Sequence, residues 1–255
     1  WPLPHWIFDL GQNMVGRVRI RVKGKRGTTL TVRHAEMLDD KGRLYTANLR
    51  SALQTDHYTL KGGGTETWEP RFTFHGFRYV QITGLKEKPG PETVTGLVLH
   101  SDLEPSGTFD VSDPLVSRLQ KNIVWGQRGN FLEVPTDCPQ RYERLGWTGD
   151  AQVFIRTAAF NMNVAPFFTK WIQDAEDSQS PRGAIPPVIP NTGIAGGDGG
   201  PAWADAFLIC PWTVYEIYGD RRILQNHYPA YRRFVEYLRQ GSLDLVRCHP
   251  DREPW

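Results

Sequence analysis

The sequence has no long hydrophobic run, few cysteines and little net charge. No apolar stretch approaches the roughly 20 residues that a bilayer-spanning helix needs, so we expect no membrane partner. The formal net charge of +2 creates no strong field for nucleic acid, and none is expected as a partner. The three cysteines, Cys138, Cys210 and Cys248, are widely spaced and odd in number. This pattern argues against a disulfide framework. We therefore expect buried structural thiols, no metal and no cofactor.

An initiator methionine and a recognisable signal peptide are also missing. The chain begins at Trp1 and ends at Trp255, and both ends resemble cuts in a longer protein. The compartment (cytoplasmic, periplasmic or secreted) and the oligomeric state therefore stay open. With 255 residues, the chain has room for one large domain or two modest ones.

Aromatic residues are abundant, with nine Trp, nine Tyr and twelve Phe. Carbohydrate-handling proteins use such rings as stacking platforms for sugars. Composition alone favours the simpler interpretation, a large aromatic core.

The first hundred residues alternate between apolar and polar positions. Val18, Ile20 and Val22 alternate with the basic side chains of Arg17–Lys23, which we interpret as the solvent face of a strand pair and not as an anion-binding patch. The same alternation recurs at Leu30 and Val32, Phe72 and Phe74, Val80 and Ile82, and residues 96–99. Glycine-containing turns separate these runs. The pattern predicts an antiparallel β-sandwich over residues 1–103.

The period changes to that of a helix after a linker at 104–112. Leu115, Leu119 and Ile123 fall on one helical face, and Ser112 or Asp113 can cap the helix. Further helices are expected from about Thr148, after Asn163, from about Pro201 to Tyr218, and from Gly219. Helices in series with alternating short and long connections indicate helical hairpins. We expect residues 113–255 to form the N-terminal part of an (α/α)6 six-hairpin barrel.

An acid-rich segment with two turn glycines lies between the first two predicted helices. Asp137, Glu143 and Asp150 accompany Arg141 and Trp147 there. Glycoside hydrolysis needs a protonated carboxyl group, and the charges of flanking aspartates would raise the pKa of a central glutamic acid. Arginine can hold a sugar hydroxyl, and tryptophan can cover the apolar face of a sugar ring. For the spacing alone, a surface loop of mutually paired charges is the better interpretation.

Longer motifs favour a sugar-cleaving site over a surface loop of paired charges. Residues 137–152 read DCPQRYERLGWTGDAQ, and the sequence closely resembles the signature of bacterial α-L-rhamnosidases of glycoside hydrolase family 78. Four ordered motifs in the first hundred residues resemble the β domain that precedes the catalytic barrel in this family. These motifs are Phe8–Gly16, Arg33–Glu36, Thr55–Gly62 and Pro70–Val80. Taken alone, each motif is a strand with its turn.

The resemblance implies a role for each residue that matches a family motif. Glu143 is implied to be the general acid, with Trp203 and Asp205 as rim residues. The residues implied to bind rhamnose at the cleavage position are Asp137, Arg141, Trp147 and Asp150. Trp203 could equally be a core residue at a helix start. Tyr142 stands where the family often has Asp, which removes one carboxylate beside the acid.

The resemblance also implies an inverting hydrolase that cleaves terminal α-L-rhamnose from oligosaccharides or glycosides. No acid between Asp174 and Glu253 matches the context of the family's general base. We therefore expect the base beyond Trp255 and an inactive isolated fragment. The alternative is a non-catalytic carbohydrate-binding protein with a degenerate barrel, and a third possibility is an α/α-barrel hydrolase for another sugar. The seven histidines show no ligand spacing, so we expect surface or satisfied core positions.

Overall fold

The computed structural model describes residues 4–247, and the chain clusters into two compact units. The first, here called the β unit, comprises Trp1–Ser101, Val111–Leu132 and Cys138–Arg144. The second, the helical unit, comprises Asp102–Asp110, Glu133–Asp137 and Leu145–Trp255. The acid-rich segment therefore contributes to both units. The predicted domain boundaries stay a prediction.

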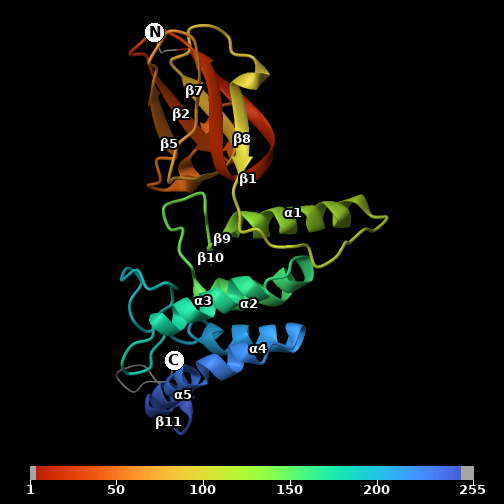
Figure 1. The fold of residues 1–255 in the computed structure, drawn as a ribbon, viewed down its shortest axis with the longest axis vertical. Helices are drawn as coiled ribbons and strands as arrows, with labels where there is room; N and C mark the ends of the chain where they lie inside the picture. Colours follow the sequence, from red (N-terminus) through yellow and green to blue (C-terminus); the bar gives the residue numbers. More distant parts are fainter. Residues whose placement is uncertain (1–3, 248–255) are drawn as a thin grey trace. The chain divides into compact units, whose positions relative to one another are not determined.

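The β unit contains one six-stranded antiparallel sheet with the strand order β5-β2-β7-β1-β6, to which β8 is added by pairing with β1 (Figure 1). The strands are β1 (His5–Lys23), β2 (Thr29–Ala35), β5 (Thr55–Thr59), β6 (Thr65–Trp68), β7 (His75–Thr83) and β8 (Val94–Val98). Its short elements are β3 (Met37–Leu38), β4 (Leu44–Tyr45), β9 (Phe131–Leu132) and the 3-10 turns η1 (Ala47–Leu49) and η2 (Pro91–Thr93). The predicted antiparallel β fold is confirmed.

Strand β1 organises this sheet because it pairs with three neighbours in turn. Its first half pairs with β7, its register shifts between Asp9 and Met14, and its second half pairs with β8 and β6. Val18 and Ile20 are fully buried in the core of the unit, whereas Arg19 is exposed and bonds Glu69. The basic face of β1 is therefore a solvated face, as predicted.

One strand prediction is wrong. Phe72 and Phe74 were expected in a strand, but they lie in the turn before β7, and Phe72 is fully exposed with φ 58°. A bulky residue in the left-handed region cannot continue a strand. The alternation at Phe72 and Phe74 therefore belongs to a loop.

Helix α1 (Pro114–Asn130) begins where predicted, and Asp113 caps it by accepting the backbone N–H of Leu115 at 2.8 Å. Its packing differs from the prediction. Leu115 and Leu119 are 78% and 57% exposed, whereas Gly129 packs against Val15 of β1. The absence of a side chain at Gly129 lets this helix turn approach the sheet closely. Periodicity identified the helix but not the face that packs.

The helical unit holds four further helices around an aromatic core. They are α2 (Thr148–Asn161), α3 (Ala165–Asp177), α4 (Ala206–Tyr218) and α5 (Arg222–Gln240), with the short strands β10 (Val134–Pro135), β11 (Ser242–Leu243) and β12 (Val246–Arg247). Helix α4 contacts α2, α3 and α5. Phe168, Trp171, Phe207 and Phe234 are among its largest buried side chains, which confirms an aromatic core. Helix α4 begins at Ala206, later than predicted, because residues 201–205 form turns. No helix in the described part of the chain is long and apolar enough to span a bilayer.

Candidate active site

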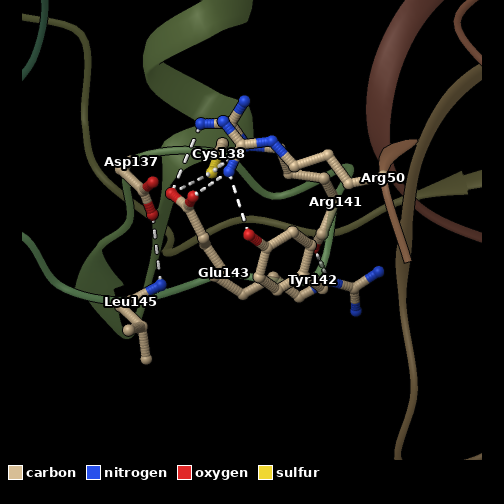
Figure 2. A network of polar contacts seen from close by, with 8 residues as sticks. Arg50, Asp137, Cys138, Arg141, Tyr142, Glu143 and Leu145 are labelled. Carbon is tan, nitrogen blue, oxygen red and sulfur yellow. Dashed lines mark hydrogen bonds and ion pairs between the residues drawn. The ribbon is translucent and has the colours of Figure 1, made fainter. Parts of the chain in front are cut away.

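Glu143 is the centre of a polar cluster in the β unit, and Figure 2 shows two arginine side chains reaching it. Arg50 Nη1 donates to Glu143 Oε1 at 2.7 Å. Arg141 Nη2 and Cys138 Sγ both donate to Oε2, at 3.3 Å and 3.2 Å. The Glu143 side chain is 21% exposed, so it is reachable from solvent. The structure thus brings together Glu143 and Arg141, two of the predicted site residues.

Cys138 has more contacts than a purely structural thiol needs. It is buried, as expected, but its sulfur also accepts a hydrogen bond from Arg141 Nε at 3.0 Å. This bond raises the pKa of Arg141, so the guanidinium stays charged beside Glu143. Cys210 is buried as expected, and burial raises the pKa of its thiol. Cys248 lies outside the described residues.

Arg50 is a site residue that the sequence did not reveal. It directly follows η1 and has φ 54°. Its guanidinium donates to the hydroxyl of Tyr142 at 3.0 Å and lies 5.6 Å from the centre of that ring. Tyr142 therefore offers Arg50 a hydrogen-bond acceptor, although its side chain has no carboxylate. No local pattern marks Arg50, because the contact joins residues 93 positions apart.

The two guanidinium groups favour the ionised carboxylate of Glu143, since opposite charges at hydrogen-bond distance stabilise the charged form. This influence opposes the one expected from the flanking aspartates. If Glu143 is a general acid, it must stay protonated although Arg50 and Arg141 both stabilise its ionised form.

Arg50→Gln in the full-length protein is expected to move the alkaline limb of the kcat/KM profile to higher pH. Activity that needs a protonated Glu143 is lost as pH rises, and removing a nearby positive charge favours the protonated form. Rates on an alkyl rhamnoside across pH 4–9 would measure this shift. Arg50→Lys keeps the charge and is the control. An unchanged limb in Arg50→Gln would show that Arg50 does not act on the acid.

In the helical unit, Asp137 and Leu145 bind each other. The backbone N–H of Asp137 donates to the carbonyl of Leu145 at 3.1 Å, and the Leu145 N–H donates to Asp137 Oδ1 at 3.2 Å. Trp147 forms an isolated antiparallel bridge with Val188 immediately before α2. Asp150 is exposed in the first turn of α2.

Trp203 and Asp205 lie in the turns that precede α4. Trp203 is 42% exposed, more than a core residue would be, and a side chain at Gly149 would meet its indole nitrogen at 3.1 Å. Trp203 therefore lies against the helix turn that carries Asp150. Asp205 accepts the backbone N–H of Ala202 at 2.9 Å, which holds the turn beside Trp203.

The β unit also brings together three residues that the sequence treated as unrelated. Ligand atoms of His34, Asp56 and His75 lie within 4.8 Å of one another. Both histidines are buried and hydrogen-bonded, in line with the expected core positions, although the sequence did not predict that strands β2, β5 and β7 bring them together with Asp56. Asp56 already lies at hydrogen-bond distance from His75, at 2.8 Å.

The antiparallel β unit and the helices in series agree with the fold predicted from the sequence. Residues 104–252 match the bacterial alpha-L-rhamnosidase 6 hairpin glycosidase domain, and residues 2–100 match the bacterial alpha-L-rhamnosidase concanavalin-like domain. The chain belongs to the bacterial α-L-rhamnosidase family, as the motifs predicted.

Relatives and solved structures agree with this assignment. An α-L-rhamnosidase of Streptomyces avermitilis is 52% identical over 95% of this chain, and one of Formosa agariphila is 45% identical over 94%. The chain spans 23% and 26% of these two relatives. The crystal structure of the Streptomyces avermitilis enzyme complexed with L-rhamnose matches with a TM-score of 0.92 at 50% identity, over 96% of this chain and 25% of that one. The α-L-rhamnosidase from Dictyoglumus thermophilum matches with a TM-score of 0.92 at 39% identity, over 97% of this chain and 29% of that one.

Proposed function

We propose that the protein containing this chain hydrolyses terminal α-L-rhamnosides, with Glu143 as the general acid. The observation that carries the proposal is the match of residues 104–252 to the six hairpin glycosidase domain, which includes Glu143 within the segment that resembles the family's signature. The 50% identity to an enzyme solved with L-rhamnose supports the choice of sugar. The partner is a rhamnose-containing oligosaccharide or glycoside.

The residues proposed to hold the rhamnose lie in the same segment, 137–152. Asp137 and Asp150 would accept hydrogen bonds from sugar hydroxyls, and Arg141 would donate one. Trp147 would cover the apolar face of the ring. Trp203 and Asp205 are proposed as rim residues of the helical unit, and the exposure of Trp203 supports this placement.

The reaction is proposed to invert the anomeric carbon. Glu143 gives its proton to the departing oxygen while a second carboxylate takes a proton from the attacking water. No acid between Asp174 and Glu253 has the expected context, and the chain covers 23% of the Streptomyces avermitilis relative. We therefore place the base in a part of the protein outside these 255 residues.

One observation favours the alternative, a carbohydrate-binding protein without turnover. The two guanidinium groups around Glu143 favour the carboxylate, which cannot donate a proton. Under the enzyme proposal, Arg141 turns from Glu143 to a sugar hydroxyl when substrate binds, and this removes one of the two positive charges.

A panel of aryl glycosides incubated with the full-length protein tests the proposal. We expect hydrolysis of the α-L-rhamnoside in preference to the other sugars. Proton NMR during the first turnovers should show the β anomer of free rhamnose, because inversion converts an α-glycoside into a β product. A first product with α configuration would contradict inversion. Calorimetric binding of rhamnose without any hydrolysis would favour the binding protein.

A further inference from the structure

A buried amide connects the polar interior of the β unit to the segment that carries Glu143. Gln54 is 4% exposed, and its Oε1 accepts hydrogen bonds from His75 Nδ1 at 2.6 Å and from Arg144 Nη2 at 2.9 Å. Its Nε2 donates to the carbonyl of Gly76 at 3.1 Å, which fixes the orientation of the amide. Gln54 therefore links His75 to the residue that directly follows Glu143.

Both ring nitrogens of His75 lie at hydrogen-bond distance from oxygen atoms. Nδ1 faces Gln54 Oε1, which can only accept, and Nε2 faces the Asp56 carboxylate at 2.8 Å. Burial alone would raise the pKa of Asp56, but the hydrogen bond and charge of His75 outweigh it and keep this pKa below its usual value. His75 therefore connects the amide of Gln54 to the carboxylate of Asp56 through its two ring nitrogens.

His34 is the neutral ring of the cluster. Its Nδ1 donates to the carbonyl of Gln54 at 3.0 Å, and its buried Nε2 has no hydrogen-bond partner among the described residues. Burial, together with the charge of His75, lowers the pKa of His34 to about 3. The two rings stack with centroids 4.1 Å apart.

Arg144, the residue after Glu143, is held by other contacts besides its hydrogen bond to Gln54. Its Nη1 donates to the carbonyl of Phe74 at 2.8 Å, and its guanidinium lies 4.8 Å from the centre of the Phe74 ring. Burial lowers the pKa of Arg144, and the charge of Asp56 opposes that effect. Arg144 and Gln54 have φ of 54° and 49°, a conformation that non-glycine residues keep only where their surroundings hold them.

We propose that Asp56, His75 and Gln54 are positioning residues that hold Arg144, and with it the adjoining Glu143, in the geometry for proton donation. The proposal rests on the proposed role of Glu143 as general acid. It gives the β unit a part in catalysis without direct contact with the sugar. The titratable groups next to His75 are Asp56 and His34. Arg144 shares the Gln54 oxygen with His75, and the charge of His57 lowers the pKa of Asp56.

A divalent metal bound by His34, Asp56 and His75 would have to break the 2.8 Å contact between His75 Nε2 and Asp56. The charge of Arg144, which acts on Asp56, would oppose the added positive charge.

His75→Gln in the full-length protein, compared on two rhamnosides, tests the proposal. An alkyl rhamnoside needs a proton on its leaving oxygen, whereas a dinitrophenyl rhamnoside departs without one. We expect kcat/KM to fall by tenfold or more, and up to about 100-fold, on the alkyl substrate and by less than about threefold on the dinitrophenyl substrate. Exposed His5 at the start of β1 supplies the control, His5→Gln, which should leave both rates unchanged. Asp56→Asn, which keeps the shape of the side chain, should show the same selective loss on the alkyl substrate. It replaces His75→Gln as the test variant if His75→Gln does not fold.

Three outcomes would overturn the positioning role. They are an equal loss on both substrates, no loss on either, or one equivalent of transition metal bound per purified chain. Glu143→Gln, measured in parallel, separates this proposal from the previous one. If Glu143→Gln shows no selective loss on the alkyl substrate, the acid assignment fails. If Glu143→Gln shows that loss and His75→Gln does not, only the positioning role fails.

Discussion

Glu143→Gln in the full-length protein is expected to lower kcat/KM for an alkyl α-L-rhamnoside by about 10³-fold, within the range that general acids contribute. Glutamine has nearly the same size and keeps an acceptor for Arg50 Nη1, which bonds Glu143 at 2.7 Å. It has no proton to give to the departing oxygen. Rhamnose binding should change by only a few-fold, because the residues proposed to hold the sugar are intact.

Steady-state rates on the alkyl substrate and calorimetric titration with rhamnose would measure the two effects. Glu87→Gln, at an exposed position of the β unit, is the matched control and should leave both unchanged. Wild-type turnover in Glu143→Gln would remove Glu143 from the reaction. A loss of rhamnose binding as large as the loss of turnover would instead make Glu143 a sugar ligand.

Gly76→Ala is expected to reduce turnover by about 100-fold through displacement of the segment Cys138–Arg144, since misplacement by about 1 Å can have this effect. A Cβ at Gly76 would lie 2.7 Å from Cβ and 2.9 Å from Cα of Gln140. The obstacle includes backbone, so the segment or β7 must move. Glu143 lies in the same segment, and its bonds to Arg50 and Arg141 would change with it.

Gly126→Ala offers the matched control, because an added Cβ in α1 meets nothing within 4 Å. It should leave turnover unchanged and stabilise the helix by roughly 0.5–1 kcal/mol. Rates and thermal unfolding of both variants would be compared. Full activity in Gly76→Ala would show that the close approach of Gln140 does not position the acid.

Local patterns predicted much of the fold. The alternation at Val18 and Ile20 identified a strand with one buried and one solvated side, and Asp113 identified the start of α1. The same reasoning failed at Phe72, where a left-handed backbone interrupts the alternation. It also failed for the packing face of α1, because Leu115 is exposed and Gly129 is buried. Periodicity indicates the type of an element, but the neighbours decide which side packs.

The sequence by itself determined the family, the acid-rich segment and the choice of Glu143 as candidate acid, since these depend on residues that are adjacent along the chain. Only the tertiary structure placed Arg50 on Glu143 and assembled His34, Asp56 and His75 into one group. The physical reason is that hydrogen bonds and charge interactions act over a few ångströms in space. Strand pairing brings His34, Asp56 and His75 within that range, although they come from three separate strands, and no spacing along the chain reports such closeness.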